Sequence, residues 1–398
     1  MNDNPRPIRI GLLWHSINSG NLGVGALTVA NQAIARDVAG EMGLSPEFVV
    51  MQMRDSGTPG MSLPDTKTFV IDRKAITSPG GFWRAVGEVD CVLDIGAGDS
   101  FADIYGARRF FFLWITKLMA ILRGTPLVLS PQTIGPFTKR GYRLPASFVM
   151  RRSETVVARD AISRDIASAM APGANVEMAV DVAFVLPYRD QSALRGGPKI
   201  RIGVNASGLL FHEAETGRNR FGLSYDYARF TRALLTELAA RPGVELFLVP
   251  HATSTTDPSD DDGALADRLA TEFSAAVRVP NFVDPSEAKS FISGLDLLVA
   301  GRMHACIGAF SSGTAVLPVA YSRKFTGLFG LLDYDHVLPV SGLDEDGALA
   351  LVRLAIEKRD DLAADAVRGM TTVQGLLDIY REALRRLFRK AVNRRRRT

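Results

Sequence analysis

Short apolar runs alternate along the chain with longer stretches in which apolar residues recur every three or four positions. The short runs predict buried strands, and the longer stretches, such as residues 25–40, predict helices. Their alternation predicts βαβ units and a mostly parallel, doubly wound α/β sheet. The predicted strands are residues 8–14, 90–96, 126–132, 155–160, 178–186, 200–208, 244–252, 277–283, 296–301 and 315–321.

Residues 187–199 interrupt this rhythm. The segment is rich in Pro, Gly and charge, which is typical of a domain boundary, and the strand pattern restarts at residue 200. Beyond about residue 345 the pattern is only helical. We therefore predict an N-terminal Rossmann-like domain (1–187), a second one (198–345), and C-terminal helices with a basic tail (346–398). The two domains should face a cleft, with the last helices bracing them.

The composition is that of a soluble globular protein, because 46% of the residues are apolar and 23% are charged. Cys91 and Cys306 lie in apolar runs, and the N-terminus does not resemble a signal peptide, so we expect a cytoplasmic protein. The most apolar segment, residues 108–124, contains Lys117 and is too short to cross a bilayer. It is predicted to be a buried helix.

The net charge of +4 is unevenly distributed. Residues 381–398 hold nine Lys or Arg against Glu382, a charge of +8, which leaves −4 for the remainder. The tail, which includes Arg394–Arg397, could contact an anionic membrane while Leu384, Leu387 and Phe388 lie on it. Alternatively, these three residues could pack on the N-terminal domain and leave only the arginines free, as a solvated helix end. We predict no nucleic-acid partner and leave both explanations of the tail open.

Ligands of open α/β sheets bind beyond the carboxyl ends of the strands, so the loops there are candidate sites. The first of them has Gly20, Gly23 and Gly25 as G-x-x-G-x-G, which is not the dinucleotide order G-x-G-x-x-G. The Walker pattern, paired Cys-x-x-Cys motifs and His-Glu-x-x-His are absent from the sequence. Neither a P-loop nor a recognisable zinc site is therefore predicted.

The sequence "GRMHA" at 301–305 follows a predicted strand. If the strand ends at Ala300 and a helix begins near Arg302, the free N–H groups and the guanidinium form an anion site. His304 then lies in the first helical turn, where it suits a proton donor. A surface Arg and a His that caps the helix are the structural alternative.

Other strand ends carry polar residues that could face the same crevice. The next strand is followed by Arg323 and Lys324, and Gln132 ends an apolar run before a Gly-Pro turn. Arg159 also ends a strand, although a helix cap by Asp160 is the ordinary explanation for that pair.

These loops together resemble the polysaccharide pyruvyl transferases, from about residue 9 to 332. The family pattern N-x-G-N-x-G-D is similar to Asn18–Gly23, G-G-G-x-x-x-D to Gly96, Ala97 and Gly98 running to Asp103, and Q-S-I-G-P to Gln132–Pro136. R-D-x-x-S is similar to Arg159–Ser163, D-P-A-F to Asp181–Phe184, R-x-H to Arg302–His304, and a late Y-x-x-K to Tyr321–Lys324. Val24 stands where the family has Asp, and Ala97 replaces the central glycine.

The resemblance implies a glycosyltransferase-B-like architecture and the transfer of a pyruvyl group from phosphoenolpyruvate to a sugar, as a ketal. No metal or tightly bound cofactor is implied. The acceptor would be a saccharide of a polysaccharide or its lipid-linked precursor, which would bring the enzyme to the inner membrane surface.

The resemblance and the residues together suggest roles at the site. His304 is the candidate acid, and Asp99 or Asp103 the candidate group that orients or deprotonates the acceptor. The candidate substrate-binding residues are Arg302, Lys324, Arg159, Gln132, Asn18, Asn21, Gly96, Gly98, Tyr321 and Arg323. A nucleotide-sugar glycosyltransferase of the same architecture and a non-catalytic carbohydrate-binding protein remain the alternatives.

Overall fold

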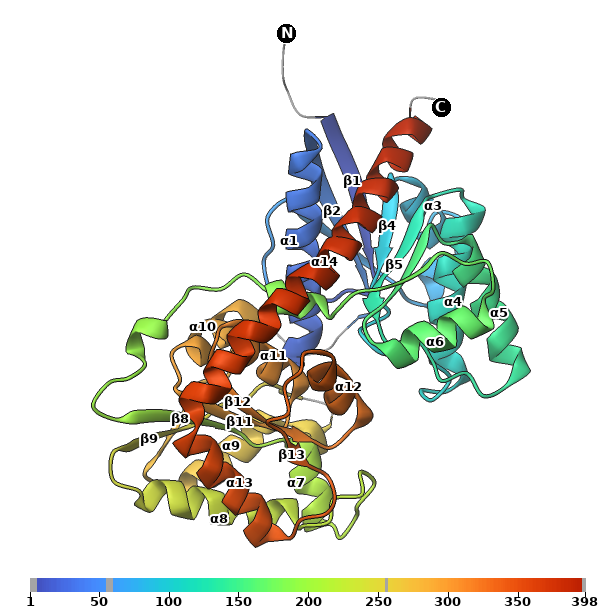
Figure 1. Ribbon diagram of the computed structural model, residues 1–398. Helices are drawn as coiled ribbons and strands as arrows, with labels where there is room; N and C mark the ends of the chain where they lie inside the picture. The colour runs from blue at the N-terminus through green and yellow to red at the C-terminus, as the bar shows by residue number, and fades with distance from the viewer. Residues whose placement is uncertain (1–5, 55–59, 255–256, 396–398) are drawn as a thin grey trace.

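Two parallel β-sheets organise the chain in the computed structural model, which describes residues 6–54, 60–254 and 257–395 (Figure 1). The first sheet has seven strands in the order β3-β2-β1-β4-β5-β6-β7, and the second has six in the order β10-β9-β8-β11-β12-β13. The strands of the first sheet are β1 (Arg6–Leu13), β2 (Leu44–Gln52), β3 (Thr66–Val70), β4 (Cys91–Asp94), β5 (Leu127–Gln132), β6 (Thr155–Ala158) and β7 (Val176–Met178). Those of the second are β8 (Ile200–Asn205), β9 (Val244–Leu248), β10 (Ala276–Arg278), β11 (Leu297–Ala300), β12 (Ala315–Ala320) and β13 (Leu338–Pro339).

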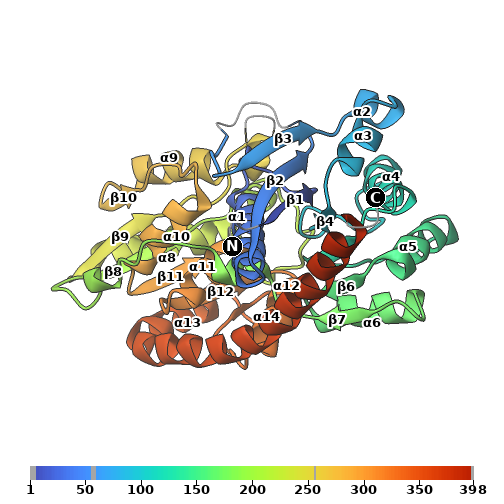
Figure 2. The same cartoon turned by 90° about the horizontal axis from the view of Figure 1, so that it is seen from above.

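Helices follow most of the strands and cover both faces of each sheet (Figures 1 and 2). In the first half they are α1 (Leu22–Glu41), α2 (Arg73–Thr77), α3 (Phe82–Gly87), α4 (Ala107–Leu122), α5 (Arg140–Arg152) and α6 (Ala161–Met170). In the second half they are α7 (Gly208–Glu215), α8 (Tyr227–Ala240), α9 (Asp262–Glu272), α10 (Pro285–Ser293), α11 (Met303–Ser311) and α12 (Arg323–Leu331). The chain ends in α13 (Glu345–Glu357) and α14 (Arg359–Arg395), and short 3-10 turns lie at Val182–Val185, Ser192–Leu194 and Pro258–Asp260.

The strand order places two switch points where ligands can bind. In each sheet the chain adds strands first on one side of the first strand and then on the other, as in the doubly wound dinucleotide fold. The crevices lie between β1 and β4 in the first sheet and between β8 and β11 in the second. The loops after β1, β4, β8 and β11 leave the sheets at these crevices, and they include the predicted candidate loops with Gly20, Gly96 and Arg302.

Three predictions about secondary structure are wrong in part. Residues 178–186 are not a strand, because only Met178 belongs to β7 and Asp181 accepts a hydrogen bond from the backbone N–H of Ala183, which starts a 3-10 turn. The strand predicted at 277–283 is limited to β10, and the prediction missed β2, β3 and β13.

The helix predicted at 108–124 is present, but it is not fully buried as predicted, because only one of its faces packs on the sheet. Leu113 and Lys117 face the sheet, whereas Phe111 and Leu122 are 48% and 63% exposed. The Lys117 ammonium is fully buried and lies 2.9 Å from the Asp94 carboxylate, so the charge inside the apolar segment is neutralised there. Within the described ranges, no helix is long and apolar enough to cross a membrane.

Helix α14 runs from the second sheet to the first and braces them, as expected (Figure 1). Leu384, Leu387 and Phe388 are fully buried in the core that it shares with α1 and the first sheet, so the prediction that they lie on a membrane is wrong. Burying these side chains in the protein stabilises the fold by about 1.5–3 kcal/mol each relative to exposing them to water.

The cations of the tail are largely engaged in ion pairs. Arg386 lies 2.5 Å from Glu177, Arg385 lies 2.7 Å from Glu41, and Lys390 pairs with Glu154. Arg395 donates to the carbonyl of Pro7. Arg396 and Arg397 lie outside the described residues. The basic tail therefore docks α14 against acidic groups of the first half of the chain.

Lys289 of α10 contacts the backbone of residues 184–186, which follow the first sheet, and this contact can be tested by its effect on stability. The Lys289 side chain is 3% exposed and donates to the carbonyls of Phe184 and Leu186 at 3.1 and 3.0 Å, while burial lowers its pKa to about 7. The unfolded chain then binds more protons than the folded chain between about pH 7 and 10.5, so stability rises with pH in that window.

Lys289→Met should remove this pH dependence. We expect the stability of the wild type relative to the variant to increase by on the order of 3 kcal/mol between about pH 6.5 and 9.5, measured by urea unfolding. Lys199→Met, at an exposed position, is the control and should leave the pH profile unchanged. Parallel profiles for wild type and Lys289→Met would contradict the assignment.

Candidate functional site

A cavity of about 640 Å³ lies between the carboxyl edges of the two sheets, and we call it the inter-sheet cavity. Residues of both halves line it, which matches the cleft that the sequence predicted. Eight of the predicted site residues contribute to its wall: Asn21, Gly98, Asp99, Arg159, Arg302, His304, Tyr321 and Lys324.

The β11–α11 connection has the predicted form. Strand β11 ends at Ala300, Arg302 occupies the N-cap position of α11, and His304 lies in the first turn of the helix. The Arg302 N–H donates to the side chain of Asn205 at 2.9 Å, which fixes the turn to the end of β8. The sequence therefore located the helix start correctly from "GRMHA".

The Arg302 guanidinium is buried between two carboxylates. Its Nη2 lies 2.6 Å from Asp262 and 2.6 Å from Asp260, and its Nε also donates to Asp262. Although burial alone would lower the pKa of Arg302, these carboxylates raise it above its ordinary value. The sequence did not predict this pairing, which orients the guanidinium and compensates part of its charge.

His304 faces Asp181 across the boundary between the two halves. Its Nε2 lies 3.7 Å from Asp181 Oδ2, longer than a hydrogen bond, and Arg159 Nη1 donates to the same oxygen at 2.7 Å. Burial would raise the pKa of Asp181, but His304 and Arg159 lower it below its ordinary value. Asp181 therefore stays ionised next to the His304 ring.

Two glycines of the first loop allow α1 to approach the second half of the chain. A Cβ atom at Gly23 would overlap the His304 ring, 2.8 Å from Cγ, and one at Gly20 would overlap the backbone of Thr253. The Asn21 side chain caps α1 by accepting from Gly23 N–H at 2.9 Å. The G-x-x-G spacing thus serves close packing around His304.

Asp99 and Lys324 form an ion pair across the cavity. The Tyr105 hydroxyl donates to Asp99 at 2.8 Å. Burial would raise the pKa of Asp99, but Lys324, Arg159 and the Tyr105 hydroxyl lower it overall. A carboxylate with a lowered pKa is a weak base, so the position of Asp99 suits orienting a hydroxyl better than deprotonating it.

In the second half of the chain, two helices begin at the inter-sheet cavity without a side-chain cap. The N-cap residues of α11 and α12 are Arg302 and Ser322, and neither side chain bonds to the first turn. In contrast, the side chain of the N-cap residue bonds to the first turn in α7, α8, α9 and α10. Uncapped N–H groups and the positive helix end favour an anion at both places.

Other predicted residues lie outside the cavity wall. Gln132 is fully buried, and its Nε2 donates to the Asp94 carbonyl at 2.7 Å behind Gly96, so it supports the glycine loop instead of facing the crevice. The carboxylate of Asp103 accepts hydrogen bonds from the backbone and side chain of Thr138. Asn18 accepts from the Ser16 hydroxyl. The side chain of Arg323 is outside the described part of the structure.

Ala97 has a φ of 50°, in the left-handed region where glycine is favoured. Ala97→Gly should therefore stabilise the protein by about 0.5–1 kcal/mol, because relief of this strain exceeds the entropy that glycine adds to the unfolded chain. Denaturant titration measures the change. Ala364→Gly, in the exposed part of α14, should lower stability by about 1 kcal/mol, and a similar loss for Ala97→Gly would refute the strain.

The sequence analysis missed five polar residues that line the cavity: Tyr105, Arg109, His251, Asp260 and Ser322. Arg109 lies in the first turn of α4 and donates to Ser100 at 2.7 Å. Arginines in a first helical turn oppose the helix dipole. This unfavourable pattern in "GARRF" could have indicated that Arg109 has a binding role. Burial is the largest cause that lowers the pKa of His251 to about 3, so it lines the cavity as a neutral ring.

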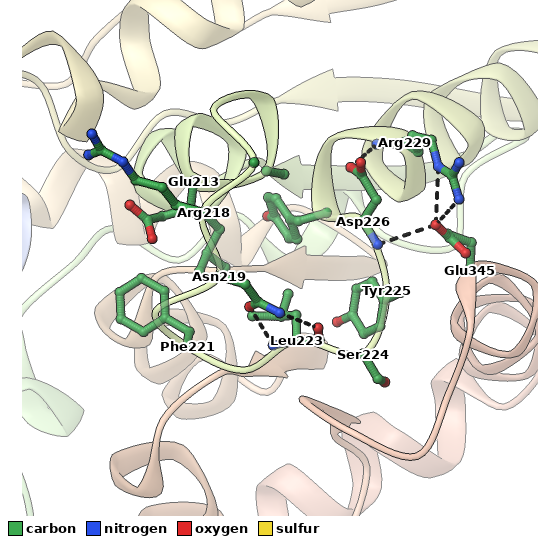
Figure 3. A pocket seen from close by; sticks show the side chains of 14 residues that line it. Glu213, Arg218, Asn219, Phe221, Leu223, Ser224, Tyr225, Asp226, Arg229 and Glu345 are labelled. Carbon is green, nitrogen blue, oxygen red and sulfur yellow. Dashed lines mark hydrogen bonds and ion pairs between the residues drawn. The ribbon is translucent and has the colours of Figure 1, made fainter.

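A second hollow of about 510 Å³ lies beside α7 and α8, and Phe221 contributes to both hollows (Figure 3). Most of its polar groups already have partners: Asn219 bonds to the backbone of Leu223, Asp226 caps α8, and Arg229 pairs with Glu345. We therefore place the candidate chemistry in the inter-sheet cavity. Among the described residues, no group of three His, Cys, Asp or Glu side chains is arranged to hold a metal ion.

A family model described as polysaccharide pyruvyl transferase matches residues 36–323. The chain belongs to this family. It is also 21% identical over 306 residues to the amylovoran biosynthesis protein AmsJ of Erwinia amylovora, covering 71% of this chain and 69% of that protein.

Solved structures with the same architecture support the predicted fold. A sucrose-phosphate synthase of Thermosynechococcus elongatus superposes with a TM-score of 0.57 at 12% identity, covering 98% of this chain and 99% of the other. An α,α-trehalose 6-phosphate synthase of Burkholderia multivorans superposes with a TM-score of 0.54 at 12% identity, covering 97% and 100%. At this identity the likeness concerns the fold, which is glycosyltransferase-B-like.

Proposed function

We propose that this protein transfers a pyruvyl group from phosphoenolpyruvate to a sugar of a polysaccharide or its lipid-linked precursor, as a pyruvate ketal. The observation that carries the proposal is the pair of uncapped helix starts, α11 and α12, at one cavity that also holds His304. A donor with a phosphate and a carboxylate has two anionic groups for two such positions. The family membership supports a transferase that acts in polysaccharide biosynthesis.

Four permanent cations of the cavity wall are available to hold the donor: Arg109, Arg159, Arg302 and Lys324. Three of them are partly compensated by Asp181, Asp260, Asp262 and Asp99. Arg109 contacts a serine hydroxyl, and no carboxylate of the described chain pairs with it. We assign Arg109 and the α11 N-terminus to the phosphate, and Lys324 with the α12 N-terminus to the carboxylate.

His304 would act as the acid in the proposed reaction. It delivers a proton to the methylene carbon of phosphoenolpyruvate, the neighbouring carbon becomes an oxocarbenium-like centre, and a sugar hydroxyl attacks that carbon. Phosphate leaves with its bonding electron pair, and a second hydroxyl closes the ketal. Of the two hydroxyl protons released, one leaves with phosphate and one returns to the imidazole. Asp99 would orient the acceptor.

Mass spectrometry of saccharides incubated with the protein and phosphoenolpyruvate tests the proposal. We expect products that carry one ketal-linked pyruvate, with one phosphate released for each. No cofactor is proposed, so the reaction should proceed in the presence of a metal chelator. Calorimetry with phosphoenolpyruvate and, separately, with nucleotide sugars distinguishes the alternatives, because a glycosyltransferase would bind only the nucleotide sugars. Failure to bind either donor would favour a non-catalytic carbohydrate-binding protein.

A further inference from the structure

The segment 104–153 has an unusual charge composition. It holds nine Lys or Arg and no Asp or Glu, whereas the whole chain has 47 and 43, so the other residues have 38 basic against 43 acidic. This segment contains α4 and α5, which pack side by side at the end of the molecule away from the second sheet (Figures 1 and 2). This segment therefore carries a net charge of +9 on one pair of helices, apart from the +8 of the tail.

The cations of these helices are exposed and lack acidic partners. Apart from the buried Lys117, the eight basic residues of the segment are all exposed. Within the described ranges, none of the eight lies within 4.0 Å of a carboxylate. The basic residues of α14 differ, because several of them pair with Glu41, Glu154 or Glu177. The described chain therefore supplies no acidic partner for the exposed cations of α4 and α5.

Apolar side chains are aligned between these cations. On α4, Phe111, Ile115, Leu118 and Leu122 recur at helical spacing. Phe111 and Leu122 are exposed, Ile115 is half-buried, and Leu118 packs partly against the core. On α5, Leu144 is 70% exposed, and Phe148, which the Arg152 guanidinium covers, is 36% exposed. Single exposed apolar residues are common, but an aligned set bordered by arginines marks an interaction surface.

We propose that this α4–α5 surface, formed by the exposed side chains of residues 104–123 and 139–152, binds the face of an anionic phospholipid bilayer. The cations are spread over both helices, which suits a continuous sheet of negative headgroups, and the apolar side chains can enter the headgroup boundary between them. A second copy of this chain fits less well, since two such surfaces would bring like charges together.

The surface is continuous with the inter-sheet cavity. Tyr105 and Arg109, at the start of α4, are exposed and also line the cavity. A membrane-bound saccharide could therefore enter the cavity without leaving the bilayer surface. The inference on membrane binding rests on charge and exposure, and it stands or falls independently of the proposed reaction.

Co-sedimentation of the full chain with phosphatidylcholine vesicles, with and without phosphatidylglycerol, tests the proposal. We expect binding only to the anionic vesicles, weakened by salt. The triple variant Arg140→Gln, Arg143→Gln and Arg151→Gln should bind about 100-fold more weakly, because each cation near an anionic surface contributes about fivefold. The double variant Leu144→Ser and Phe148→Ser should also bind more weakly and should need less salt to dissociate.

Matched variants control for general effects. Leu354→Ser and Val367→Ser change exposed apolar residues on α13 and α14 and should leave vesicle binding unchanged. Circular dichroism checks that each variant is folded, and turnover with a soluble acceptor should not change in the α5 variants. Equal binding of the triple variant and the wild type would overturn the proposal. A dimer that the α5 variants dissociate, without vesicle binding, would instead identify the surface as a contact between copies and would also overturn it.

Discussion

His304→Ala should lower turnover by roughly 10²–10⁴-fold, the usual effect of removing a general acid, while phosphoenolpyruvate still binds. His304 lies at the start of α11 beside the Asp181 carboxylate. The donor, in contrast, would be held by the cations and the uncapped helix starts. Binding and turnover should therefore separate in this variant.

Calorimetry of donor binding and phosphate release together measure this separation. His336→Ala is the matched control, because His336 is also half-buried and beside a carboxylate, Asp365, but does not line the inter-sheet cavity. It should keep wild-type turnover. If folded His304→Ala turned over at the wild-type rate, another group would have to deliver the proton. If it lost donor binding as well, His304 would belong to the donor site and not act as the acid alone.

Local sequence was enough to predict the β11–α11 connection. An apolar run that ends at Ala300, a glycine, and a charged pair specify a strand, a turn and a helix start within a few residues, so no distant contact is needed. The position of Arg159 was also predictable from local sequence, because Asp160 caps α6 and leaves Arg159 at the strand end, facing the cavity. Such features depend on neighbours in the chain.

Features that depend on distant partners were not predictable. Gln132 also ends a strand, but side chains alternate along a strand, and its amide faces the Asp94 carbonyl in the interior. Asp181 lay in an apolar run that looked like a strand, and only the folded chain brings Arg159 and His304 to it. The sequence predicted an apolar side on α14, but it could not distinguish a membrane from the first sheet as the partner of that side.

Gly23→Ala should reduce turnover by about 100-fold although the residue performs no chemistry. The added Cβ would overlap the His304 ring, so either the imidazole or the start of α1 must move. A shift of about 1 Å in a catalytic group is enough for an effect of this size. Because alanine favours helices, the loss should appear in turnover and only weakly in stability.

Gly40→Ala in the same helix separates the steric effect from helix propensity. Nothing lies within 4 Å of a Cβ at Gly40, so this variant should gain about 0.5–1 kcal/mol of stability and keep full turnover. The double variant Gly23→Ala with His304→Ala gives the decisive comparison. If Gly23 acts only by leaving room for His304, the double variant should be no slower than His304→Ala alone, because the two changes remove the same contribution. If the turnover losses of the two single variants multiplied in the double variant, Gly23 would affect the site in another way, such as through the approach of α1 to the donor.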